Sequence, residues 1–165
     1  PFMNEAVTKR FLLYFRLMLL VRILIANAFF HVMEFDYSWL VFLSNIMLFT
    51  MEGDIKDCFL SVELGGLVGM VFTVIALLAI TFVTPVLGSF FGFLIPLAVV
   101  LFVLIILHPY APKVLNNVGF AYLTVACIDA ETFAANLPLF FATYILGSLA
   151  FHRVCVLLML SLMHL

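Results

Sequence analysis

Long apolar blocks alternate with short polar or Gly- and Pro-bearing junctions along this chain, and the junctions divide it into six segments. The segments cover residues 11–33, 37–52, 58–84, 86–108, 114–129 and 132–152, and an apolar tail runs on to Leu165. A helix needs about 20 apolar residues to cross the hydrocarbon core of a bilayer. The pattern therefore predicts an all-α integral membrane protein with six transmembrane helices, in which 37–52 and 114–129 reach only about 24 Å.

The charges at the junctions predict the topology. With six spans, all basic residues outside the apolar blocks lie at one face of the membrane, namely Lys9, Arg10, Lys56, Lys113 and Arg153. Arg16 lies near the same face. The junctions at the other face carry only acidic residues, namely Glu34, Asp36, Asp129 and Glu131. If the two short segments did not cross, Lys56 and Lys113 would move to the acidic face. The positive-inside rule therefore favours six spans with the N- and C-termini in the cytoplasm.

The order long, short, long occurs twice, in residues 11–84 and again in residues 86–152. Three helices in each half would make the halves inverted repeats of one another, an arrangement common among secondary transporters. We expect a single transmembrane domain over residues 1–165. Residues 153–165 are predicted to form a separate tail at the cytoplasmic interface, because Arg153 follows a full spanning length.

Composition supports the membrane assignment. Hydrophobic residues make up 67% of the chain and charged residues 10%, against about 45–50% and 25% in soluble domains. A net charge of −2 without a basic run gives no reason to expect nucleic acid as a partner. No hydrolase, P-loop or metalloprotease motif is found, and Cys58, Cys127 and Cys155 lack metal-ligand spacing. We expect no enzymatic activity, no cofactor and no metal, and we expect the lipid bilayer to be the main partner.

Polar side chains inside the predicted spans are the candidate site residues, because such groups cannot face lipid cheaply. Asn27 and Asn45 both fall near the expected midplane, and further polar groups mark segment 114–129: Asn116, Asn117, Tyr122 and Thr124. Two interpretations stay open. These groups line a solute path, or they bond neighbouring helices together.

Arg22 and Glu63 are opposite charges predicted at matching depth, about 7–8 Å from the cytoplasmic face. A lone charge inside a bilayer is costly, and pairing is the usual relief. We predict that Arg22 and Glu63 form a pair, which either locks two helices together or takes part in a solute or proton site.

Glycines four residues apart predict close helix packing. Gly65 and Gly69 form one such pair, and Gly88 and Gly92 form a second. Small residues at this spacing let two helices approach closely in lipid.

Two stretches resemble a known family. Residues 37–72, with Trp39, Gly53 and Lys56, and residues 116–151, with Pro138 and Gly147, resemble small six-helix bacterial inner-membrane proteins that are classed as a domain of unknown function. The membrane part of fusaric-acid-type aromatic acid exporters is similar at a greater distance. The resemblance implies location in the bacterial inner membrane and implies no activity.

Taken together, these patterns predict a small transporter or channel for a small polar or anionic organic solute, with Arg22 supplying the positive charge. The alternative is a non-transporting helical subunit that packs into, or helps to assemble, a larger membrane complex. A homo-oligomer or partners in such a complex are compatible with either function.

Overall fold

The computed structural model describes residues 5–35, 37–51 and 53–163. These residues form six α-helices and a single 3-10 turn, with no strand among them. The elements in chain order are α1 (Glu5–Val32), α2 (Trp39–Thr50), α3 (Ile55–Ile106), η1 (His108–Tyr110), α4 (Asn117–Ile128), α5 (Ala130–Ala135) and α6 (Leu137–Met163). The predicted all-α class is confirmed for this part of the chain.

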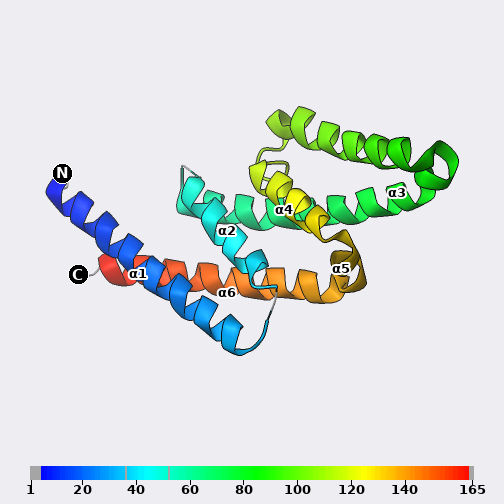
Figure 1. Ribbon diagram of the computed structural model, residues 1–165. Coiled ribbons are helices and arrows are strands. Elements are labelled where there is room, and N and C mark those ends of the chain that lie inside the picture. Colours follow the sequence, from blue (N-terminus) through cyan, green and yellow to red (C-terminus); the bar gives the residue numbers. More distant parts are fainter. Residues whose placement is uncertain (1–4, 36, 52, 164–165) are drawn as a thin grey trace.

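The longest element, α3, is a hairpin of two arms (Figure 1). The chain reverses at Gly88, whose φ of 78° and ψ of 169° belong to a region that is essentially restricted to glycine. The sequence predicted the break beside Pro85, which was three residues too early. Proline holds φ near its helical value and can continue a helix, whereas reversal of the chain requires a positive φ. Gly92 packs the returning arm against Thr84 of the first arm.

The short helices α2 and α4 are packed inside the bundle. α4 packs along α3, while α2 contacts both α3 and α6 (Figure 1). Their inward side chains join those of the long helices in one core, which includes Leu40, Val62, Met70, Val118, Tyr122, Phe133 and Tyr144. The expectation of two short middle helices is therefore met: each has 12 residues and reaches about 18 Å.

The last predicted segment differs from the structure at both ends. Residues 130–135 form the separate helix α5, and α6 begins at Leu137, next to Pro138, which is a favoured residue in a first helical turn. At its other end α6 continues to Met163. The residues from 153 to Met163, expected as a separate tail, are thus continuous with α6, because no proline or glycine follows Gly147 to end the helix. Their expected place at the cytoplasmic interface stays a prediction.

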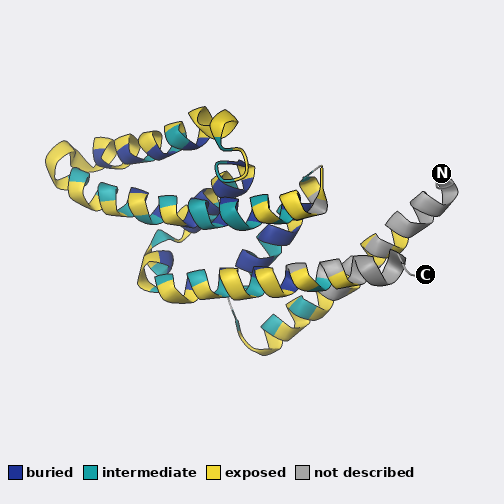
Figure 2. Ribbon diagram, turned by 180° about the vertical axis from the view of Figure 1, so that it is seen from behind, coloured by how far each residue is buried: buried dark blue, intermediate teal, exposed yellow. Residues whose placement is uncertain are grey.

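Much of the apolar surface faces outwards. Figure 2 shows exposed residues along the arms of α3 and on the described part of α1, and Phe82 and Val86 near the hairpin turn are 75% and 79% exposed. The accessible surface is 10619 Å², whereas a compact soluble monomer of this mass exposes about 8,200 Å². By length and composition, one helix among the described residues, Lys56–Ile106, could cross a membrane.

Candidate functional site

Glycines bring the helix backbones together at the centre of the bundle. A Cβ on Gly69 would lie 2.2 Å from the backbone oxygen of Gly119, so α3 and α4 touch backbone to backbone. Gly65 lies against the Asn116 side chain, and Gly147 of α6 lies against Val41 of α2. Of the four glycines predicted to pack helices, Gly65, Gly69 and Gly92 do so, whereas Gly88 has nothing within 4 Å of its Cβ position.

The helices α2, α4 and α6 also carry fully buried polar side chains. We call this set the central polar cluster, and its members are Ser44, Asn45, Tyr122, Tyr144 and Ser148, each 0% exposed. Two of its hydroxyls bond to carbonyl groups of their own helices: Ser44 Oγ to Val41 O at 2.7 Å, and Ser148 Oγ to Tyr144 O at 2.6 Å. Such local bonds satisfy a buried serine without a partner helix.

The two tyrosines of the central polar cluster link different helices. Tyr122 of α4 donates to the backbone oxygen of Leu40 in α2. Tyr144 of α6 donates to Val62 O of α3 at 2.8 Å, and its hydroxyl comes so close that Gly66 has no room for a Cβ. The two rings meet edge to face, with centroids 4.9 Å apart. Together they connect α4 to α2 and α6 to α3.

Asn45 is the exception in the central polar cluster. Neither its amide nitrogen nor its amide oxygen has a hydrogen-bond partner among the described residues. A buried polar group left unsatisfied costs about 1–3 kcal/mol, and nearly all buried polar groups in proteins are paired with protein or with water. Among the five buried side chains, Asn45 is thus the one whose polar atoms are left unpaired by the described residues.

Glu63 borders the central polar cluster from α3. The Ser148 hydroxyl lies 2.9 Å from Glu63 Oε2 and shares its single proton between this oxygen and Tyr144 O. The Tyr144 hydroxyl likewise lies 3.2 Å from the backbone oxygen of Glu63 and shares its proton with Val62 O. Arg22 lies on α1, but its side chain is outside the described part of the structure. The pairing of Arg22 with Glu63 stays a prediction.

Three of the other predicted residues face away from this centre. Asn27 is exposed on α1 and bonds Ile23 O of its own helix. Thr124 is exposed and bonds Phe120 O, and Asn117 is exposed at the start of α4. The structure thus brings Asn45, Tyr122 and Glu63 to one region of the core and leaves Asn27, Asn117 and Thr124 outside it.

Asn116 has a structural role. Its Oδ1 accepts hydrogen bonds from Val118 N and Gly119 N, which caps α4, and its Nδ2 donates to Ser61 O of α3 at 2.9 Å. We expect Asn116→Ala to lower the free energy of unfolding by about 1–2 kcal/mol, since the cap and the link between helices are both lost. Thermal unfolding in detergent, followed by circular dichroism, measures this change.

The neighbouring Asn117 provides the matched control, because its side chain is exposed. Asn117→Ala should leave the unfolding midpoint near that of the original protein. Equal midpoints for the two variants would contradict the capping role of Asn116.

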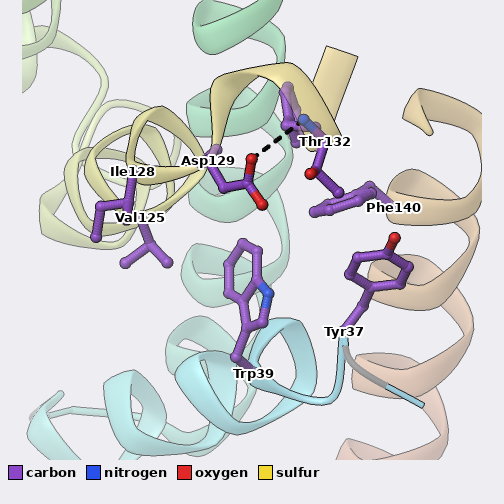
Figure 3. A pocket seen from close by; sticks show the side chains of 9 residues that line it. Tyr37, Trp39, Val125, Ile128, Asp129, Thr132 and Phe140 are labelled. Atoms are coloured by element: carbon purple, nitrogen blue, oxygen red, sulfur yellow. Dashed lines mark hydrogen bonds between the residues drawn. The ribbon is translucent and has the colours of Figure 1, made fainter. Parts of the chain in front are cut away.

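One pocket opens at each end of the α2–α4 pair. The first, of about 460 Å³, lies beside Trp39 where α2 begins; its walls include Tyr37, Trp39, Asp129, Thr132, Phe133 and Phe140 (Figure 3). We call it the aromatic pocket. The second, of about 340 Å³, lies beside Met51 where α2 ends; its walls include Asp54, Asp57, Ser61, His108, Asn116 and Asn117. We call it the acidic pocket.

The residues of the aromatic pocket were not predicted as a site from the sequence. Two signals were present: Trp39 is the single tryptophan of the chain, and Asp129 follows directly after an apolar segment. The acidic pocket contains Asn116 and Asn117, which were selected. It also contains Asp57. The Oδ1 atom of Asp57 and the Nζ atom of Lys113 form an ion pair of 2.7 Å, and this pair joins the start of α3 to the loop before α4.

The arrangement therefore consists of two pockets about 18 Å apart along α2, with the central polar cluster between them. No group of three or more His, Cys, Asp and Glu side chains suited to hold a metal is found in the described ranges. No protein-family model, curated protein sequence or solved structure matches this chain.

Proposed function

We propose that this chain is a small integral membrane transporter or channel, and that it moves a small polar organic solute between the aromatic pocket and the acidic pocket. The observation that carries the proposal is the amide of Asn45. It is fully buried and has no partner among the described residues, and it lies on the helix that connects the two pockets. Substrate sites of secondary transporters lie near the midplane, at the interface between the repeats.

The exposed apolar surface supports the membrane part of this proposal. Soluble monomers rarely expose continuous apolar patches beyond a few hundred Å². Along the second arm of α3, Phe90, Phe93, Val99, Phe102 and Ile105 are all more than half exposed. Lipid would cover these residues without any polar atom having to lose its hydrogen bonds.

Two glycine contacts support the proposed inverted repeats. Gly69 of α3 meets Gly119 of α4, and Gly147 of α6 meets Val41 of α2. The sequence separation between Val41 and Gly119 equals that between Gly69 and Gly147. Adding this one separation to the residue numbers of the first half therefore gives the matching residues of the second half. In each case a short middle helix packs on the third helix of the other half. Six spans with both termini in the bacterial cytoplasm remain our proposal for the topology, together with the resemblance to six-helix inner-membrane proteins.

Two solute classes follow from different residues. Arg22 predicts an anion as the solute, whereas the aromatic pocket predicts a cation.

The second candidate function is a non-transporting subunit of a membrane complex. It is favoured by the exposed turn of α3, where Phe82 and Val86 would be covered by another protein instead of by lipid.

Flux through the purified protein alone tests the proposal. Liposomes containing the protein are mixed with isosmotic tetramethylammonium chloride, sodium lactate or glycine, and swelling is followed by stopped-flow light scattering. We expect at least one of these solutes to enter faster than it enters protein-free liposomes. Entry at the protein-free rate for all three would reject transport of these solute classes and favour the subunit.

A further inference from the structure

The aromatic pocket has walls of one chemical kind. Trp39 and Phe140 have ring centroids 6.0 Å apart, and Tyr37 and Phe140 have centroids 4.4 Å apart. Phe133 extends this group, with its centroid 5.1 Å from that of Phe140. Tyr37 lies in the turn before α2 and Trp39 is the first residue of α2, while Phe133 and Phe140 come from α5 and α6, so the pocket exists only in the folded chain.

One charged group faces these rings. The Asp129 carboxylate uses Oδ1 to accept the backbone N–H of Thr132 at 3.2 Å. Its second oxygen has no hydrogen bond to any described residue, and Figure 3 shows the carboxylate pointing into the space that Trp39 and Tyr37 also face. A ligand in the pocket would therefore meet aromatic faces and a negative charge together.

The surrounding sequence contains no positive charge to balance Asp129. No Lys or Arg occurs between Ile23 and Ile55, or between Val114 and His152. These stretches include all of α2, α4 and α5, and they also contain the acidic residues Glu34, Asp36 and Glu131; Asp36 lies outside the described residues. No lysine or arginine of these stretches therefore balances the charge of Asp129.

We propose that the aromatic pocket binds a small organic cation of the alkylammonium class. The negative faces of aromatic rings attract such cations within about 6 Å of a ring centroid, and cages of aromatic rings are a known means of binding quaternary ammonium groups. The volume of about 460 Å³ lies within the range of small-molecule sites. This inference names the solute class of the proposed transporter and rests on that function only for transport, not for binding.

Anions and neutral solutes fit the pocket less well. An anion would lie against the Asp129 carboxylate without a basic side chain to bind it. A neutral solute would gain apolar contact with Phe140 and Trp39 but would leave the Asp129 carboxylate partly desolvated and without a counter-charge.

The chain contains a built-in reporter for this site, because Trp39 is its only tryptophan. Protein in dodecyl maltoside is titrated with tetramethylammonium chloride, and tryptophan fluorescence is recorded against sodium chloride at equal ionic strength. We expect a saturable change with tetramethylammonium and none with tert-butanol or with sodium acetate. A response to tert-butanol of equal affinity, a response to acetate only, or no saturable response to any probe would overturn the proposal.

Matched variants locate the effect. Asp129→Asn keeps a side-chain oxygen for the Thr132 N–H and removes the charge, so we expect tetramethylammonium affinity to fall about tenfold. Glu131 is exposed, lies two residues from Asp129 and does not line the pocket. Glu131→Gln removes its charge, and the affinity of this variant for tetramethylammonium should stay within about twofold of the original. Equal losses in the two variants would show a general charge effect and would reject the site.

Binding and flux separate this inference from the proposed function. Fluorescence binding without tetramethylammonium entry into liposomes would reject transport of the cation and keep the site. Tetramethylammonium entry without any response of Trp39 would keep transport and reject the site.

Discussion

Replacing Gly69 with alanine is expected to destabilise the folded bundle more than any other glycine-to-alanine change in the contacts between the helices. The new Cβ would lie 2.2 Å from the backbone oxygen and 2.8 Å from the Cα of Gly119. Backbone atoms cannot rotate away, so α3 and α4 must separate along their whole contact. Overpacking costs about 1–3 kcal/mol even where side chains can adjust, and we expect a loss at or above the upper end of that range.

Gly147→Ala is the matched control for this prediction. Its Cβ would meet only the Cγ2 methyl of Val41 at 2.3 Å, with the other Val41 atoms beyond 3.5 Å. Only this methyl group has to shift, although Val41 is β-branched and prefers one rotamer in a helix. Alanine is favoured over glycine in a helix by about 1 kcal/mol, which offsets part of the clash. Thermal unfolding in detergent should therefore show a small change for Gly147→Ala and a large decrease for Gly69→Ala. Equal midpoints for the two variants would contradict the backbone contact.

Asn45→Leu is expected to lower solute flux strongly while leaving the protein as stable as before, or more stable. The substitution removes two buried polar atoms that have no partner among the described residues. Removing such atoms relieves a cost of about 1–3 kcal/mol. If Asn45 binds the moving solute, flux should fall at least about tenfold, which corresponds to about 1.4 kcal/mol of lost interaction.

The measurement pairs liposome swelling with the unfolding midpoint of the same preparation. Asn27→Leu is the control, because this amide is exposed and bonds its own helix at Ile23 O, and we expect its flux to be unchanged. Retained flux in Asn45→Leu would exclude Asn45 from the path. Should the larger leucine lower the midpoint, Asn45→Ala removes the same amide without added volume, and its flux decides the question.

For most of the predicted site residues, the sequence could not show whether the side chain points into the core or away from it. Asn27 and Asn45 were both placed near the midplane by depth, yet Asn27 is exposed and Asn45 is fully buried. Depth follows from counting residues, but each residue turns the helix by about 100°, and a helix that is apolar all round shows no preferred inward side. The same limit applies to Tyr122 and Thr124, which point inwards and outwards from one short helix.

Local sequence determined what depends on neighbouring residues: a helical chain, two short middle helices, and reversals at junctions that contain glycine or polar side chains. Even here α3 turned at Gly88 and not at Pro85, and α6 ran past Arg153, because one charged residue does not interrupt helical hydrogen bonds. Only the tertiary structure decided that Gly69 meets Gly119, that Asn45 is enclosed without a partner, and that Trp39 shares a pocket with Asp129. Those contacts join residues far apart in the chain, and they arise from the way whole helices pack, which no single segment encodes.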